Sequence, residues 1–157
     1  VMMTVVADAN ELDRRHADEL IRYATALVGP ADAPDIVVDA MMAAFGSPGW
    51  VRVEHPRAYL FRAVLHRAQS VRRSDARRSV REARVAVSGV AVTPDPSIDA
   101  QRALAGLSAQ QRAVVFLTYW NDLTPAQVAD LMGVSEGTVR KQLARGREQL
   151  RRVLDER

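Results

Sequence analysis

The sequence contains no cysteine, few aromatic residues and no long apolar stretch. Without a thiol, disulfides, cysteine nucleophiles and cysteine-based zinc sites are excluded. Phe, Trp and Tyr supply only 5% of the 157 residues although 48% are hydrophobic, so Leu, Val and Ala must fill most of any core. This composition favours helix. No apolar run approaches the roughly 18 residues that span a bilayer.

The start of the sequence, VMMTVVADANELDRR, lacks the basic and apolar regions of a secretory signal. We therefore expect a cytoplasmic protein without membrane insertion. Motifs of enzymes are also missing: there is no glycine-rich phosphate loop, nucleophile elbow or Ser-His-Asp candidate. The histidines His16, His55 and His66 are scattered, and we expect surface or helix-end residues rather than metal ligands. The sequence thus predicts no enzyme, metal site, cofactor or small-molecule substrate.

The modest net charge of +3 conceals large differences along the chain. Residues 1–50 hold 3 basic and 8 acidic side chains, a net charge of −5, whereas residues 51–84 hold 10 and 3, a net charge of +7. Residues 85–134 carry −2 and residues 135–157 carry +3. DNA would attract both basic segments, and the acidic first third suits a protein partner. A solvated arginine-rich surface remains the alternative on charge alone.

A break in helical periodicity divides the chain. The stretch SGVAVTPDPS, Ser88–Ser97, contains two prolines and a glycine, which indicates an interdomain linker. We expect an all-α fold of two small helical domains, 8–84 and 100–157, joined by a flexible linker at 85–99.

The first domain opens with two predicted helices. Glu11–Val28 should be a helix that Gly29-Pro30 ends, and Asp32 can cap the next helix. That second helix places its apolar residues at spacings of three and four before Gly46 to Gly49 end it: Ile36, Val37, Ala40, Met41, Ala44 and Phe45. On the opposite side lie Asp35, Asp39 and Met42, where a partner could bind.

A third helix should run from near Pro56 to the arginines around Arg77. Its apolar line is Leu60, Val64, Ala68 and Val71, and its polar line is Arg62, His66, Gln69 and Arg73. Members of the polar line fall within about 60° of one another, so they could follow a nucleic-acid strand. Aromatic residues near the helix start could stack on exposed bases. We expect Phe61 in the core, and Tyr59 in either place.

The most specific pattern is LTPAQVADLMGVSEGTVRKQL, Leu123 to Leu143, which predicts a helix-turn-helix. Thr124 and Ser135 should cap its two helices, and Gly133 provides the positive φ of the turn. Small Ala129 allows close helix approach, and Val134 fills the corner. Val128 and Leu131 of the first helix should face inward, as should a stripe on the second: Val139, Leu143, Gly146 and Leu150.

The outward side of this second helix is polar and basic. Thr138, Lys141 and Arg145 point away from the stripe, with Arg140 and Gln142 on the flanks. A recognition helix presents such a face to the major groove, where Arg and Lys bind guanine and Gln binds adenine. An amphipathic helical hairpin with a solvated side is the alternative that we favour less.

Residues 11–154 resemble the extracytoplasmic-function sigma factors of bacterial RNA polymerase. The run ALAGLSAQQRAVVFLTYWNDLTPAQVADLMGVSEGTVRKQLARGREQLRRVL is similar to their fourth region, with Ser108 where proline is usual. The run ADAPDIVVDAMMAAF resembles the helix that binds the clamp coiled coil of the polymerase, and HPRAYLFRAVLHRAQSVRR resembles the helix that captures the melted promoter. The resemblance implies that core RNA polymerase and promoter DNA are partners, and, by analogy only, an anti-sigma factor.

The helix faces and the resemblance together predict three groups of site residues. The polymerase would contact Asp35, Asp39 and Met42. The melted strand would contact Arg57, Tyr59, Arg62, His66, Gln69, Arg72 and Arg73. The upstream promoter element would contact Ser135, Thr138, Arg140, Lys141, Gln142 and Arg145. His66 and Lys141-Gln142 depart from the residues that are frequent in the family, so the preferred promoter sequence is left open.

Two other functions are compatible with a helix-turn-helix. A conventional regulator would sense a ligand or dimerise through its first half and bind palindromic DNA. Its sensing domain has no need of the basic segment from Val51 to Arg84, which argues against it. A protein-interaction module that binds polymerase without supporting initiation is the third alternative.

Overall fold

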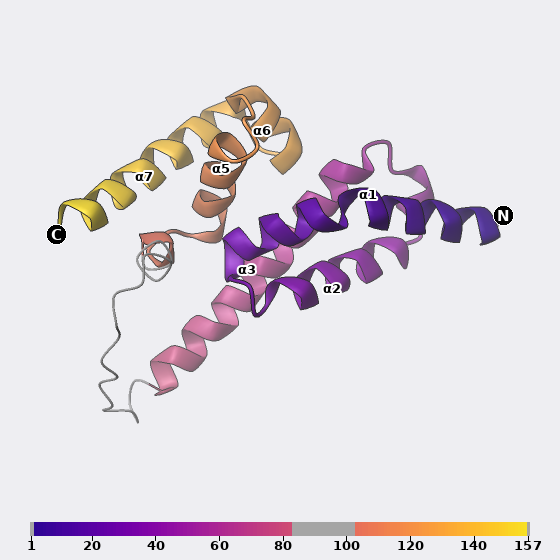
Figure 1. The fold of residues 1–157 in the computed structure, drawn as a ribbon, viewed down its shortest axis with the longest axis horizontal. Helices are drawn as coiled ribbons and strands as arrows, with labels where there is room; N and C mark the ends of the chain where they lie inside the picture. The colour runs from indigo at the N-terminus through magenta and orange to yellow at the C-terminus, as the bar shows by residue number, and fades with distance from the viewer. Residues whose placement is uncertain (1, 83–102, 157) are drawn as a thin grey trace.

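The computed structural model describes residues 2–82 and 103–156. These residues form helices and connecting turns, without a strand, in the order α1 to α3 and α5 to α7 (Figure 1). The first three helices form one body and the last three form the other. The predicted linker lies outside the described residues.

The first body consists of α1 (Met2–Val28), α2 (Ala33–Phe45), a short 3-10 turn (Trp50–Arg52) and α3 (Pro56–Glu82). α1 begins nine residues before the predicted start at Glu11, and α3 runs five residues beyond Arg77. The end of α1 is as predicted, because Gly29 adopts φ +90°.

Asp32 does precede α2, but it does not cap it as expected. Its backbone is helical, at φ −95° and ψ −17°, and its carboxylate makes no hydrogen bond to the helix. An N-cap side chain reaches the amides of the first turn from an extended backbone, which Asp32 lacks. Pro34 lies in the first turn of α2, where proline needs no amide partner.

Apolar residues of the three helices meet between them. The predicted core side chains of α2 are buried apart from half-buried Phe45. Phe61 is only 1% exposed and lies against Tyr23, with ring centroids 4.6 Å apart. Phe61 is therefore a core residue, as predicted. Buried Trp50 lies edge-on between Phe45 and Tyr59, so the connection between α2 and α3 closes one end of this core.

The second body consists of α5 (Ala109–Tyr119), α6 (Pro125–Met132) and α7 (Glu136–Asp155). α5 and α6 both begin with a capping box, in which Ser108 pairs with Gln111 and Thr124 pairs with Gln127. Ser135 caps α7 by accepting a hydrogen bond from the amide of Thr138. The caps predicted for the helix-turn-helix are thus confirmed.

The turn between α6 and α7 also has the expected geometry. Gly133 adopts φ +71°, a left-handed conformation that a residue with a Cβ rarely adopts. Val139, Leu143 and Gly146 are buried, whereas Leu150 is half-buried. At Gly146 an added Cβ would lie 3.1 Å from Val115 of α5, so the missing side chain lets α5 and α7 pack closely.

The two bodies contact each other. α5 packs against α1 and α3, and α6 packs against α3. Buried apolar residues form one cluster that continues from Leu20 and Phe61 of the first body to Val114 and Val128 of the second. The sequence predicted two tethered bodies, and the structure adds an apolar contact between them that the sequence did not indicate.

Candidate nucleic-acid and polymerase interfaces

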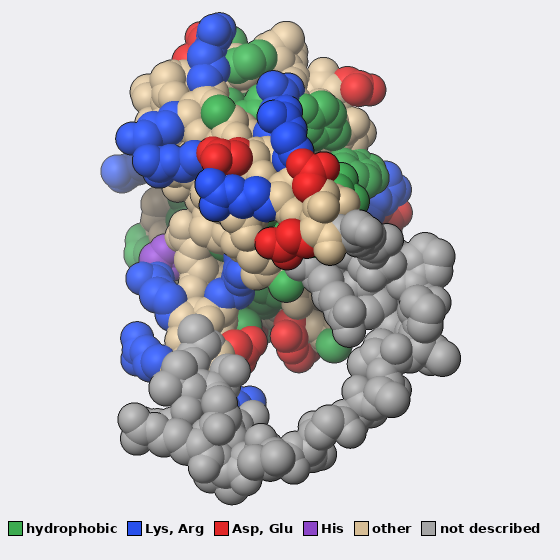
Figure 2. Space-filling view, turned by 90° about the vertical axis from the view of Figure 1, so that its left-hand side faces the viewer, with side chains coloured by type: hydrophobic (Ala, Val, Ile, Leu, Met, Phe, Trp, Pro, Cys, Tyr) green, Lys and Arg blue, Asp and Glu red, His purple; other side chains and the backbone are tan. Residues whose placement is uncertain are grey.

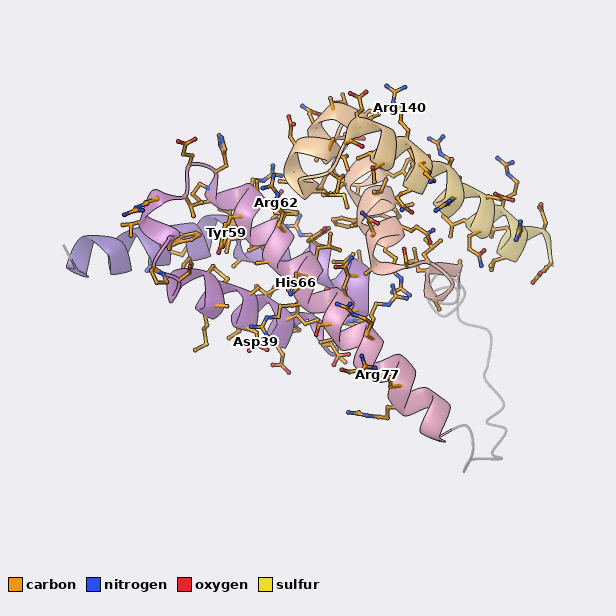
Figure 3. The ribbon with its side chains drawn as sticks, turned by 180° about the vertical axis from the view of Figure 1, so that it is seen from behind. Asp39, Tyr59, Arg62, His66, Arg77 and Arg140 are labelled. Atoms are coloured by element: carbon orange, nitrogen blue, oxygen red, sulfur yellow. The ribbon has the colours of Figure 1, made fainter. Side chains whose placement is uncertain are left out.

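The recognition helix α7 separates a buried side from a basic side. Lys141 and Arg145 are exposed, as is Arg140, which points out of the upper body in Figure 3. In Figure 2, basic side chains gather over the upper body with acidic ones among them. The face predicted for the major groove is therefore accessible to a duplex.

The other residues of this face have partners within the chain. Ser135 is the helix cap, and its hydroxyl also lies 2.8 Å from that of Thr138. Arg140 donates to Glu136 at 2.6 Å. Gln142 is half-buried, and its amide donates to Gln110 of α5 at 3.3 Å. These contacts fix the first turns of α7, and they leave Lys141 and Arg145 as the freest basic side chains.

The residues predicted for the melted strand do not all share one surface. His66 and Arg73 are exposed and Gln69 is half-exposed along α3. Tyr59 is 37% exposed and lies edge-on to Trp50, with ring centroids 5.7 Å apart. This ring therefore offers one free side on which a base could stack.

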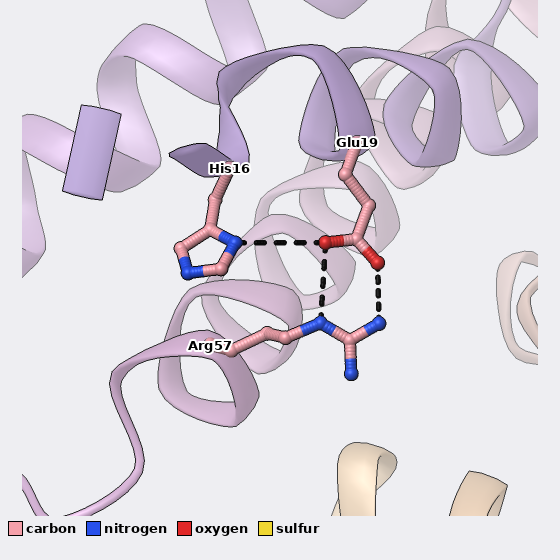
Figure 4. A network of polar contacts seen from close by, with 3 residues as sticks. All are labelled: His16, Glu19 and Arg57. Atoms are coloured by element: carbon pink, nitrogen blue, oxygen red, sulfur yellow. Dashed lines mark hydrogen bonds and ion pairs between the residues drawn. The ribbon is translucent and has the colours of Figure 1, made fainter. Parts of the chain in front are cut away.

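Arg57 is held by an ion pair that the sequence did not indicate (Figure 4). Its guanidinium forms a two-bond pair with Glu19 of α1, and Nε donates to Oε2 at 3.1 Å. His16 lies on the same carboxylate, with Nδ1 3.6 Å from Oε2. Burial alone would raise the pKa of Glu19, but the hydrogen bond and charge of Arg57, together with smaller contributions from His16, outweigh it and lower the pKa below its ordinary value.

Arg62 and Arg72 point toward the second body rather than along a free strand-binding face. Arg62 donates to the backbone oxygen of Asp130 at 2.7 Å, and Arg72 to that of Leu107 at 2.7 Å. Figure 3 shows Arg62 between the two bodies. In this conformation the predicted strand-binding group is thus divided between exposed residues and residues bound at the domain junction.

Two hollows lie at this junction. The larger, an open groove of about 1090 Å³, lies between the start of α3 and the helix α6, and its lining includes Arg57, Tyr59 and Arg62. The smaller, of about 440 Å³, is lined by Gln69, Arg72 and Arg73 together with residues 108–110 at the start of α5. Residues of both predicted DNA-binding bodies therefore border the same spaces.

The predicted polymerase-binding residues share the outer face of α2. Asp35 and Asp39 are exposed, and Met42 is 69% exposed. Asp39 points away from the second body in Figure 3. Val38 is 54% exposed on the same face, although sequence reasoning did not select it. Its position between the two aspartates could have identified it, because a partner helix binds apolar side chains as well as charged ones.

Metal sites and membrane-spanning helices are described only for part of the chain. In residues 2–82 and 103–156, no group of three His, Asp or Glu side chains could hold a metal ion. Within these ranges, no helix is both long and apolar enough to cross a membrane.

Comparison with known proteins agrees with the predicted helix-turn-helix. A family model described as "Sigma-70, region 4" matches residues 97–150. The ECF RNA polymerase sigma factor SigL of Mycobacterium tuberculosis is 32% identical over 155 residues, which cover 90% of this chain and 85% of SigL. The chain belongs to the extracytoplasmic-function sigma factors. RNA polymerase sigma-E factor of Streptomyces avermitilis is 31% identical and covers 97% of this sigma factor, with 88% of its own length aligned.

Solved sigma factors have the same fold. The sigma factor RpoE of Bartonella quintana, crystallised with the anti-sigma factor NepR, has a TM-score of 0.68 and 24% identity, with 94% of this sigma factor and 97% of RpoE covered. CnrH, in complex with the cytosolic domain of CnrY, has a TM-score of 0.64 over 98% of this chain and 96% of its own. The all-α, two-domain architecture is that of sigma factors.

Membership of this family decides between the functions that the sequence left open. Sigma factors give RNA polymerase its promoter specificity, and the family is not a family of enzymes. As a member of it, this chain is an alternative sigma factor that acts in promoter-specific initiation. The conventional dimeric regulator is not favoured.

Proposed function

We propose that this sigma factor divides its work among three surfaces of defined residues. The acidic and apolar face of α2 binds core RNA polymerase, the polar side of α3 holds the melted promoter strand, and the exposed side of α7 contacts the upstream duplex. The observation that supports this proposal most is the face of α7, where Lys141 and Arg145 are exposed opposite buried Val139 and Leu143.

The polymerase surface suits a basic, partly apolar partner. Asp35 and Asp39 supply negative charge, while Val38 and Met42 supply apolar surface beside it. Apolar contacts at the centre of an interface provide most of the affinity, and charges around them direct orientation and association rate. Met42, the more exposed of the two apolar side chains, is therefore expected to carry more binding energy than either aspartate alone.

The strand surface combines stacking with phosphate contacts. Tyr59 can stack on an unpaired base, an interaction worth about 1 to 3 kcal/mol. His66, Gln69 and Arg73 lie along the same helix and can contact bases or phosphates. None of these contacts breaks a bond; they trap bases that leave the stack when the duplex opens.

A separation-of-function experiment tests the division. Lys141→Ala should reduce promoter-specific transcription with core polymerase by about tenfold, because one good base or phosphate contact is worth about 1 to 3 kcal/mol. Its affinity for core polymerase should be unchanged. Met42→Lys should do the reverse, lowering core affinity while leaving α7 intact, because it removes the apolar contact and places a positive charge against a basic partner. Arg67→Ala, at an exposed position of α3 outside the proposed sites, is the control.

Gel shifts test the class of function at the same time. The sigma factor should shift a promoter fragment only when core polymerase is present. A shift of palindromic duplex by the chain alone would support the dimeric regulator instead. Equal losses of core and promoter affinity in Lys141→Ala would show that the assignment of α7 is wrong.

We also propose an anti-sigma factor as a protein partner, and the cytoplasm as the site of action. Support for the partner comes from RpoE, which was solved in complex with the anti-sigma factor NepR. Copurification from the source organism, followed by mass spectrometry, tests this partner.

A further inference from the structure

Three arginines hold the two bodies together, and each donates to a backbone oxygen rather than to a carboxylate. The bonds run from Arg62 to Asp130 (2.7 Å), from Arg72 to Leu107 (2.7 Å) and from Arg112 to Leu27 (3.0 Å). Two of the donors belong to α3 and the third to α5. Both bodies therefore contribute donors and acceptors to the junction.

The acceptors are carbonyl groups that their own helices leave free. Leu27 lies in the last turn of α1, and Asp130 lies in the last turn of α6. Carbonyls in the last turn have no intrahelical amide partner, so they need another donor. Leu107 follows a short helical turn at 103–105. Arg62 and Arg112 thus act as C-terminal caps supplied by the opposite body, while Arg72 binds the turn that precedes α5.

Arg62 also fits against the turn of the helix-turn-helix. A Cβ added at Gly133 would lie 2.7 Å from Nε and 2.9 Å from Cζ of Arg62. Glycine at this position therefore serves two purposes, a left-handed backbone and space for a guanidinium from the other body. The side chain is held between the bodies by a hydrogen bond and by shape.

This junction is strained electrostatically. Burial and the nearby charge of Arg72 lower the pKa of Arg112 to about 10. Within the part of the chain that the structure describes, Nη1 of Arg72 and Nε of Arg112 are buried without a hydrogen-bond partner. Among the described residues, neither guanidinium has an ion pair with a carboxylate. Two like charges and two unsatisfied donors oppose closure, while the capping bonds and apolar contact favour it.

We propose that Arg62, Arg72 and Arg112 form a latch that keeps the two bodies closed in the free chain, and that promoter DNA competes with the latch for Arg62 and Arg72. The competing role of the DNA rests on the proposed strand-binding function of α3, because both arginines belong to the strand-binding group predicted from the sequence.

The competition follows from the geometry of these side chains. A guanidinium bound to the carbonyl of Asp130 cannot also bind a phosphate of the promoter strand. A phosphate is the stronger partner because it carries a charge opposite to that of the guanidinium and can accept two parallel hydrogen bonds, whereas the carbonyl is neutral. The apparent affinity for DNA is proportional to the open fraction, so opening the latch should raise it.

Arg112→Met separates the latch from the DNA surface. Arg112 is in α5, outside every surface assigned to DNA or polymerase, and methionine keeps part of its apolar length. Arg112→Met loses the bond to the Leu27 carbonyl but also relieves the repulsion from Arg72, which solvent screens because Arg112 is half-exposed. The lost bond should outweigh this relief and raise the open population, and with it the affinity for a single-stranded oligonucleotide, about two- to fivefold. Arg62→Ala should open the chain equally but should not gain affinity, because it also loses a DNA contact.

Opening can be measured by energy transfer between dyes. The chain has no cysteine, so the double variant Ala43→Cys and Ala144→Cys places one label on an exposed position of each body. Transfer should be lower in Arg112→Met than in the parent, and Arg67→Ala should not change it. Adding the oligonucleotide should lower transfer in the parent. Circular dichroism verifies that each variant keeps its helices.

The outcomes are distinct. Unchanged transfer in Arg112→Met would overturn the latch. Lower transfer without a gain in oligonucleotide affinity, in a chain that does bind it, would overturn the competition. If the opened variant binds no oligonucleotide at all, the strand-binding function fails while the latch stands. Opening of the labelled parent by the oligonucleotide supports the competition, because this parent carries no substitution at the junction.

Discussion

The ion pair between Glu19 and Arg57 offers a quantitative test of how the first body is held together. It joins α1 to the start of α3 through a two-bond contact, and the side chains are 29% and 41% exposed. Glu19→Gln keeps the size of the side chain but removes its charge. Hydrogen bonds to charged groups contribute about 1.5 to 3 kcal/mol, and partial solvent exposure reduces this contribution. Glu19→Gln should therefore lower the free energy of unfolding by about 1 to 2 kcal/mol.

The pH dependence of this loss identifies its cause. The pKa of Glu19 in the folded chain lies below its ordinary value of 4.5. The contribution to stability is therefore complete above that value, and it disappears as the pH falls through the lower folded pKa. Urea denaturation of the parent and of Glu19→Gln at neutral pH and near pH 4 should show the difference in unfolding free energy shrinking in acid.

A second ion pair provides the matched control. Glu136 and Arg140 lie four residues apart on α7 and are 46% and 68% exposed. Glu136→Gln should change stability by at most about 0.5 kcal/mol, since exposed helical pairs contribute little. Equal losses in the two variants, or a loss at Glu19 that does not depend on pH, would refute the reasoning.

Three further predictions concern single positions. The hydroxyl of Tyr23 is buried and has no hydrogen-bond partner in residues 2–82 and 103–156, so Tyr23→Phe should raise the free energy of unfolding by about 1 kcal/mol in urea denaturation. Asp122 adopts φ +51°, so Asp122→Gly should stabilise the chain in thermal melts, whereas Asp122→Val should destabilise it by at least about 1 kcal/mol. Gly146→Ala should lower the free energy of unfolding in urea denaturation, because the added Cβ would lie 3.1 Å from Val115. The same substitution should cost no stability in a chain that already carries Val115→Ala.

The sequence by itself determined the local structure of this sigma factor. Thr124, Gly133 and Ser135 specify the helix-turn-helix because capping and a positive φ depend on residues close in the chain. The apolar spacing of α2 and α7 fixed which sides are buried. The start of α5 could also have been predicted, since Ser108 and Gln111 have the spacing of a capping box. Asp32 shows the limit of such rules, because its side chain needed a backbone conformation that the preceding turn does not provide.

Only the tertiary structure decided which arginines are free. Arg57, Arg62 and Arg73 are all arginines of one predicted helix, and the sequence assigned all three to the melted strand. In the structure, Arg57 pairs with α1, Arg62 binds the end of α6, and Arg73 is exposed. A guanidinium is long enough to reach acceptors on neighbouring helices, and their positions depend on how distant segments pack. Periodicity describes one helix at a time, so it cannot reveal a partner from another body.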